Sequence, residues 1–234
     1  MTSSGLPADK YLSAYGAVCE RIAQIVTDGT CDTTIPACPG WRVHEVLAHL
    51  CGLCEDWISH RLDGYASDQW TATQVARNDD LACTQILDAW ADALSRFATL
   101  DGEFLGSPPA RWAFGDAVVH EGDVRGALGS GRVPDDAVRL ALEGTIARWH
   151  REVLGPAGVP ALHVQCELCD WWLGEPDDSD AIVVEAPLYE VFRGLAGRRT
   201  EDQVRAWNWS TDPGPYLSAG LPYPFHWTTV PLSE

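Results

Sequence analysis

Residues 38–50 read C-P-G-W-R-V-H-E-V-L-A-H-L, and this stretch shapes the N-terminal half of the chain. Pro39 and Gly40 interrupt the preceding pattern, and apolar residues then recur at helical spacing from about residue 42 to residue 62. His49 lies inside that pattern. The stretch therefore predicts an amphipathic helix that carries a histidine.

A second histidine belongs to the stretch F-G-D-A-V-V-H-E-G-D-V-R, residues 114–125. Asp116 and His120 are four residues apart, so on a helix their side chains project from the same face. If this helix packs beside the one that carries His49, two histidines and a carboxylate converge. Three protein ligands leave one coordination position of a zinc-like ion open, as a catalytic site requires. The pattern predicts a metalloenzyme.

The same residues also have an ordinary explanation. A histidine on a half-apolar helix is often a hydrogen-bonded core residue, and a D-x-x-x-H pair arises by chance in helical sequences. Spacing alone leaves the metal site and the core histidines as open alternatives.

The segment at residues 38–50 resembles the Trp-then-His second helix of the DinB-like bundle family, in the branch named after mycothiol-dependent maleylpyruvate isomerase. In that branch an E-x-x-x-H pair on a later helix joins the histidine, and an aspartate follows shortly. Asp116, His120 and Asp123 match this register. Residues 188–209, with G-R-R at 197–199, resemble the C-terminal tail found in the family.

The resemblance implies an α+β fold, in which an N-terminal four-helix bundle carries the metal and a smaller α/β part follows. It also implies mycothiol, or a comparable low-molecular-weight thiol, as cosubstrate of a cis–trans isomerase or an S-transferase. We expect zinc as the metal, with His49, Asp116 and His120 as ligands. The family usually has Glu where this chain has Asp116, which reaches one methylene less far and leaves the identity of the metal open.

Other residues around this site have less specific predictions. Asp123 lies about one helical turn beyond His120 and is expected to orient a histidine or to act as a fourth ligand, although a solvated acid is an equal alternative. Candidates for substrate binding are Arg77, Arg193, Arg198 and Trp112. For the arginines, ordinary surface placement is the alternative.

Two C-x-x-C pairs offer a rival zinc site, and they stand at residues 51–54 and 166–169. The pairs are separated by 111 residues, far more than the short spacer of a zinc ribbon, and the first pair lies within a predicted helix. We therefore expect these cysteines to be small core residues.

Composition limits the class of protein. The chain has 234 residues and a net charge of −18, from 16 Lys and Arg against 34 Asp and Glu. Such a surface repels phosphate backbones and anionic membranes, so we expect neither a nucleic acid nor a membrane partner. The resemblance implies a small-molecule substrate instead. The first ten residues carry no export signal, and no apolar run approaches the roughly 20 residues of a membrane span. We expect a cytoplasmic protein whose eight cysteines stay reduced.

The periodicity predicts two domains, residues 1–155 and residues 156–234. In the first we expect helices over residues 8–28, 42–62, 79–100 and 110–127, with a Trp-containing loop between the second and the third, and a further helix that begins at Pro134 and completes the bundle. In the second we expect strands over residues 161–168 and 181–187, a helix over residues 188–199, and a Pro-rich and aromatic tail without regular elements.

Two other functions remain open at this level. One is a biosynthetic metalloenzyme that uses the same pocket without a thiol. The other is a non-catalytic bundle that binds a small molecule or a partner protein. Fold alone does not decide among these, because function resides in the site.

Overall fold

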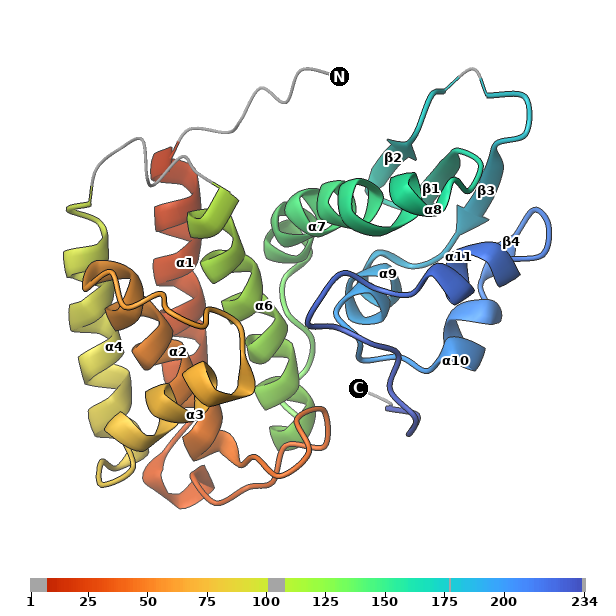
Figure 1. Ribbon diagram of the computed structural model, residues 1–234. Coiled ribbons are helices and arrows are strands. Elements are labelled where there is room, and N and C mark those ends of the chain that lie inside the picture. The colour runs from red at the N-terminus through yellow and green to blue at the C-terminus, as the bar shows by residue number, and fades with distance from the viewer. Residues whose placement is uncertain (1–7, 101–107, 177, 233–234) are drawn as a thin grey trace. The chain divides into compact units, whose positions relative to one another are not determined.

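The computed structural model describes residues 8–100, 108–176 and 178–232. Contacts within the chain divide it into two compact units, Met1–Val133 and Pro134–Ser233. Figure 1 shows helices alone in the first unit and a mixture of helices and strands in the second. The fold is therefore α+β, as the sequence predicts.

The first unit is a helical bundle. Its long helices, among the residues described, are α1 (Ala8–Ala23), α2 (Val43–Ile58), α4 (Cys83–Phe97) and α6 (Pro108–Leu128). A short 3₁₀ helix, η1 (Asp28–Thr30), follows α1. Helix α2 packs against α4 and α6, and α1 packs against the same two helices. The four helices expected before residue 128 are present.

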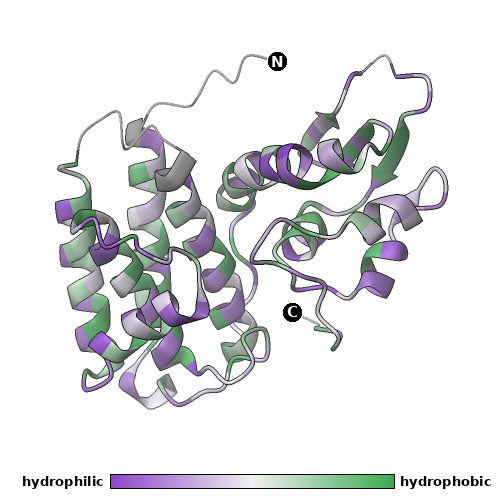
Figure 2. Cartoon of the chain, viewed as in Figure 1, coloured by the Kyte–Doolittle hydropathy of each residue, from purple (hydrophilic) through white to green (hydrophobic). Residues whose placement is uncertain are grey.

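Apolar residues at helical spacing explain the bundle. On α1 the buried residues recur at helical spacing, and they are Tyr11, Tyr15, Val18, Cys19 and Ile22. Figure 2 shows hydrophobic and hydrophilic residues side by side on the helices of this unit. Helix α2 is buried along most of its length, because it has packed neighbours on several sides.

One helix lies where the sequence predicts a loop. The segment after residue 62, expected to be a Trp-containing loop, contains α3 (Asp68–Arg77). The Ser67 side chain begins this helix by accepting a hydrogen bond from the backbone N–H of Trp70, at 3.2 Å. Helix α3 packs on α2 at Gly52, where an added Cβ would lie 2.6 Å from Cβ of Gln74. The expectation was wrong because the helix is short and has few apolar residues, so its apolar pattern is weak.

A buried ion pair joins α1 to α6. Glu121 on α6 is fully buried and accepts hydrogen bonds from Nε and Nη2 of Arg21 on α1, at 2.8 and 2.6 Å. Arg125, one turn along α6, donates to the same carboxylate at 2.9 Å. Two guanidinium groups thus compensate the burial of this charge.

A disulfide corrects one expectation about the cysteines. Cys31 and Cys83 form a disulfide that connects the segment before α2 to the first turn of α4. The other six cysteines are free thiols. The expectation that all cysteines stay reduced was wrong, because it rested on the expected compartment alone. Packing brings the Cα atoms of Cys31 and Cys83 to 5.9 Å from each other, a distance that a disulfide can span.

The second unit is built on a four-stranded sheet of order β2-β1-β3-β4, counted over the residues described. Its strands are β1 (Leu162–Cys166), β2 (Cys169–Leu173), β3 (Ile182–Glu185) and β4 (Asn208–Trp209). Strand β1 pairs with β2 in antiparallel fashion and with β3 in parallel, and β3 pairs with β4 in antiparallel fashion. Leu162 and Val164 of β1 are buried, and His163 between them is less so, as expected of alternating faces.

The helices of this unit include one that was expected in the first unit, so the observed boundary between the units differs from the expected one. They are α7 (Asp135–Trp149), the π-helical η2 (His150–Leu154), α8 (Gly155–Ala157), α9 (Leu188–Leu195), α10 (Glu201–Arg205) and α11 (Gly214–Ala219). The helix expected to complete the bundle is α7, and it instead packs on α9 and β2. The division therefore falls at Val133–Pro134 rather than near residue 155, because helical periodicity does not say which neighbour covers the apolar face.

Two smaller differences lie further along the second unit. The helix expected over residues 188–199 ends at Leu195, and α10 follows as a separate helix capped by Thr200. The tail that was expected to lack regular elements contains α11 and the end of β4. Within the described chain, no helix combines the length and the apolar character needed to cross a bilayer.

Candidate metal centre

The side chains of His49, Asp116 and His120 converge inside the first unit. His49 comes from α2, and the other two come from α6. One ligand atom from each lies within 4.8 Å of the other two. Nε2 of His49 is 3.0 Å from Oδ2 of Asp116, and Nε2 of His120 is 3.8 Å from Oδ1. The packing of α2 against α6 thus brings together three residues that sequence spacing alone could only place on two helices.

The donor set fits a divalent ion. Ligand atoms about 2.1 Å from a tetrahedral zinc ion lie roughly 3.3 Å from one another, close to the separations in this cluster. Both histidines are buried, whereas the Asp116 side chain is 30% exposed. The carboxylate therefore faces the side from which a small molecule can approach.

Asp123 contacts the other nitrogen of His120. Its Oδ2 lies 2.9 Å from Nδ1 of His120, and the carboxylate is almost completely buried. A carboxylate that accepts the Nδ1 proton leaves the Nε2 lone pair available to a metal. Carboxylates are usual partners of the second ring nitrogen in metal-bound histidines. This contact favours the orienting role over the fourth-ligand role for Asp123.

A cysteine that sequence reasoning overlooked adjoins the same pair. Sγ of Cys38 lies 3.2 Å from Oδ2 of Asp123 and 3.8 Å from Nδ1 of His120. Cys38, His120 and Asp123 therefore form a second group of possible metal ligands, which shares His120 with the first. Cys38 is the first residue of the C-P-G-W stretch. Nothing in the local spacing connects it to His120 and Asp123, which lie more than 80 positions further along the chain.

His49 has a buried amide as its second partner. Its Nδ1 lies 2.7 Å from Oε1 of Gln74, on α3. Nε2 of Gln74 donates to Oδ2 of Asp56 at 2.9 Å, and both residues are essentially inaccessible to solvent. Asp56 lies seven residues after His49 and so on the same face of α2, a spacing that could have identified it. Gln74 could not be identified, because its helix was missed.

Trp41 packs against both histidine rings. Its ring centroid is 5.5 Å from that of His49 and 6.0 Å from that of His120, and the rings of Trp41 and His120 are close to parallel. The indole thus restricts rotation of both imidazoles. The Trp-then-His order of the 38–50 stretch has a direct structural counterpart here.

The four substrate-binding candidates lie in different settings. Nη2 of Arg77 lies 2.7 Å from Oδ1 of Asp56 and donates to the carbonyl of Gly52, so this guanidinium is engaged in packing α3 on α2. Trp112 stacks on Tyr65 in the first unit. Arg193 is fully buried in the second unit. Arg198, in the same unit, donates to the Ala196 carbonyl and lies over a phenylalanine ring.

The two C-x-x-C pairs lie in different units, the first on α2 and the second on β1 and β2. Cys51 and Cys54 are buried within α2, and burial raises the pKa of the Cys51 thiol to about 12. Cys166 and Cys169 lie directly opposite each other on β1 and β2.

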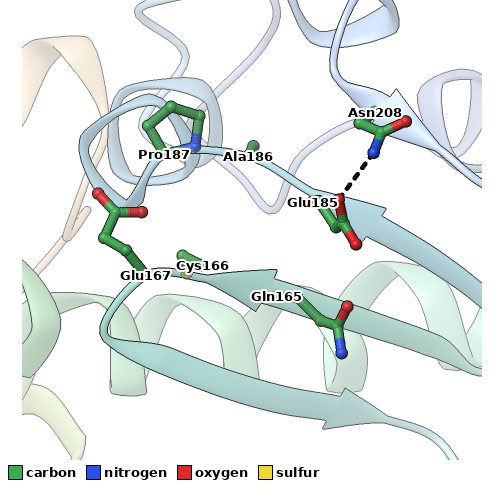
Figure 3. Close-up of a pocket in the computed structure, with 7 residues that line it drawn as sticks. All are labelled: Gln165, Cys166, Glu167, Glu185, Ala186, Pro187 and Asn208. Atoms are coloured by element: carbon green, nitrogen blue, oxygen red, sulfur yellow. Dashed lines mark hydrogen bonds between the residues drawn. The ribbon is translucent and has the colours of Figure 1, made fainter.

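The second unit contains a hollow of about 420 Å³ beside the sheet. Figure 3 shows the residues that line it, which are Gln165, Cys166, Glu167, Glu185, Ala186, Pro187 and Asn208. Asn208 donates a hydrogen bond to Glu185 at 2.7 Å, and burial raises the pKa of the Cys166 thiol to about 12. The hollow contains none of the candidate metal ligands.

The chain resembles proteins of one family. The family model described as the mycothiol maleylpyruvate isomerase N-terminal domain matches residues 13–134. The fold is similar to the crystal structure of the mycothiol-dependent maleylpyruvate isomerase, with a TM-score of 0.60 and 16% identity over 95% of this chain and 98% of that one. A histidine-to-alanine mutant of that protein gives a TM-score of 0.58 and 15% identity, with the same coverage. No curated protein matches the chain.

The matched segment contains α2 and α6, and with them every residue of the candidate centre. At these identities the solved structures establish the likeness of the fold. The family model spans more than half of the chain, and the protein therefore belongs to the mycothiol maleylpyruvate isomerase N-terminal domain family.

Proposed function

We propose that this protein is a metal-dependent enzyme that uses mycothiol, or a similar low-molecular-weight thiol, to isomerise or S-conjugate a small electrophilic substrate. His49, Asp116 and His120 are the proposed ligands, and zinc is the proposed metal. The observation that carries this proposal is the convergence of two histidine Nε2 atoms on one carboxylate, within a unit of this family. A metal held in this way would stabilise a bound thiolate at neutral pH.

The surrounding residues support a site prepared for a cation. Asp123 and Gln74 each engage an Nδ1 atom, so both histidines can present Nε2 toward Asp116. Trp41 keeps the two rings in place. The partial exposure of Asp116 leaves the centre accessible to a thiol and a substrate. Asp in place of the family's usual Glu shortens the ligand but retains its donor atoms.

Metal content is the first test. Protein purified without added metal should contain about one equivalent by elemental analysis, and the His49→Ala and His120→Ala variants should contain less than about a tenth. Asp116→Glu should retain more metal than Asp116→Ala. The matched control is His44→Ala, since His44 is also a buried histidine of α2 but contacts the Leu81 carbonyl at 3.0 Å. A metal-free wild type would favour a non-catalytic binding protein.

Thiol coordination is the second test. Cobalt-substituted protein with mycothiol should develop a sulfur-to-metal charge-transfer band, because a thiolate would occupy the open coordination position. The same addition to His120→Ala should give no band. Absence of the band with mycothiol and with other cellular thiols, in protein shown to hold cobalt, would contradict the thiol-dependent function. A metalloenzyme without a thiol cosubstrate would then be the better hypothesis.

A further inference from the structure

We propose that Asp56 and Gln74 are positioning residues that fix the tautomer of His49, so that its Nε2 lone pair faces the metal. The inference rests on the proposed metal centre and adds to it a buried chain of hydrogen bonds from Asp56 through Gln74 to His49. None of these contacts involves Asp116 or His120. We call this chain of hydrogen bonds the relay. It acts on His49 through Nδ1, whereas the proposed metal would bind Nε2, the nitrogen that faces Asp116.

The chain begins with the carboxylate of Asp56. Oδ1 accepts a hydrogen bond from Nε of Arg61 at 2.8 Å and lies 2.7 Å from Nη2 of Arg77. A carboxylate paired in this way with two guanidinium groups has only acceptors to offer. Its second oxygen, Oδ2, faces Gln74 and therefore requires a donor there.

That requirement sets the orientation of the Gln74 amide. Its NH₂ group donates to Oδ2 of Asp56 at 2.9 Å, so its carbonyl oxygen is turned toward His49. The reverse orientation would place Oε1 against the carboxylate oxygen. Because Gln74 is completely buried, water is not available to relieve that repulsion.

The amide in turn sets the tautomer of His49. Oε1 of Gln74 lies 2.7 Å from Nδ1, which must carry a proton to donate to it. Neutral His49 then presents the Nε2 lone pair to Oδ2 of Asp116, at 3.0 Å. A lone pair on Nε2 and a carboxylate oxygen repel each other at that distance, and a cation bound by both atoms would remove the repulsion. The relay thus orients His49 so that its Nε2 atom and the Asp116 carboxylate can bind the same metal ion.

Reversing the relay is the test. In the Asp56→Asn variant the two arginines still require an oxygen, so the new amide presents its NH₂ group to Gln74. Gln74 must then turn its carbonyl toward residue 56 and donate its own NH₂ group to Nδ1 of His49. The proton moves to Nε2, where it competes with the metal. We expect zinc affinity to fall by about 10–100-fold, as is typical when the partner of a ligand is changed.

A second substitution should restore the relay. In Asp56→Asn/Gln74→Glu, the amide at residue 56 donates to the carboxylate at residue 74, which again accepts from Nδ1 of His49. The number of charges equals that of the wild type. Zinc affinity, measured by competition with a chelator, should recover most of the loss. A purely structural role for Asp56 would not be rescued by adding a second change in the core.

The matched control is Asn78→Leu. Asn78 is a buried amide one turn beyond Gln74, at the C-cap position directly after α3, and it contacts the carbonyls of Ala48 and Gln74 rather than His49. Its substitution should lower the thermal midpoint and leave zinc affinity within about twofold of the wild type, the change expected when no ligand partner is altered. Circular dichroism establishes whether each variant is folded.

Failure of the relay and failure of the proposed metal site would give different results in these experiments. Wild-type zinc affinity in Asp56→Asn, or a folded double variant that binds as weakly as the single one, would overturn the relay. If the double variant does not fold, Gln74→Met removes both hydrogen bonds at similar volume, and unchanged affinity there would overturn it equally. A wild type that binds no zinc would instead overturn the proposed function on which the relay rests.

Discussion

Nδ1 of His120 lies 2.9 Å from Oδ2 of Asp123, one turn further along the same helix. The pairing gives the second histidine of the candidate centre a carboxylate behind it, as Gln74 and Asp56 do for the first. Both imidazoles therefore have their Nδ1 atoms engaged on the side away from Asp116. This arrangement supports the proposed metal centre, because metal-bound histidines ordinarily have such a partner on the second ring nitrogen.

The contact between Asp123 and His120 leads to a graded prediction. Asp123→Ala should weaken zinc binding by about 10–100-fold, because the Nδ1 proton loses its acceptor and the ring loses its orientation. Asp123→Asn should weaken it less, since an amide oxygen can still accept that proton. The measurement is a chelator competition, with Asp88→Ala on the exposed side of α4 as control. Equal affinity in Asp123→Ala and wild type would assign Asp123 no part in the centre.

Cys38 distinguishes the two possible ligand sets. If the metal lies among His49, Asp116 and His120, Cys38→Ala should retain about one equivalent of zinc, because Sγ contacts Asp123 and Nδ1 of His120 rather than Nε2. Elemental analysis of the variant checks this. Loss of the metal in Cys38→Ala, together with its retention in His49→Ala, would place the ion among Cys38, His120 and Asp123 instead.

The close approach of α2 and α3 predicts that a side chain at Gly52 destabilises the fold. In Gly52→Ala the new Cβ would lie 2.6 Å from Cβ of Gln74 and 3.0 Å from its Cα, so α3 must shift. We expect a loss of about 1–3 kcal/mol in the free energy of unfolding. The control is Gly16→Ala on α1, where nothing lies within 4 Å and a gain of roughly 0.5–1 kcal/mol is expected. Denaturant unfolding measures both, and a neutral Gly52→Ala would refute the close packing.

The buried ion pair between α1 and α6 predicts a large effect on stability. Glu121→Ala would leave the guanidinium groups of Arg21 and Arg125 without the carboxylate that they share. The expected cost is about 3–5 kcal/mol of unfolding free energy, since breaking a buried pair leaves uncompensated charge. Glu20→Ala, at an exposed position beside Arg21, should change stability by less than about 0.5 kcal/mol. Similar midpoints for both variants in urea unfolding would contradict this account.

Thiol reactivity should follow burial. Burial raises the pKa values of Cys19 and Cys51 to about 12 and also raises that of Cys54. The raised values keep these thiols protonated at pH 8, so they should not react with an aromatic disulfide reagent in the folded protein. Unfolding without a reductant should reveal six thiols, and reduction should reveal two more from Cys31 and Cys83. Eight thiols in the unreduced, unfolded protein would contradict the disulfide.

The sequence alone determined the local features of this protein. The four helices before residue 128 and the shared face of Asp116 and His120 could be predicted, because helical periodicity depends on residues only a few positions apart. The α+β class followed from the family resemblance. The resemblance carried by residues 38–50 and 114–125 pointed to the family that the comparisons then established.

Only the tertiary structure decided which distant residues meet. It brought His49 beside Asp116 across 67 positions, placed Gln74 behind His49 and Cys38 beside Asp123, and assigned α7 to the second unit. No local pattern encodes these contacts, since an apolar face specifies that it will be covered but not by which helix. The three candidate ligands could therefore be proposed from spacing and resemblance, whereas the buried partners of their side chains depend on how the helices pack.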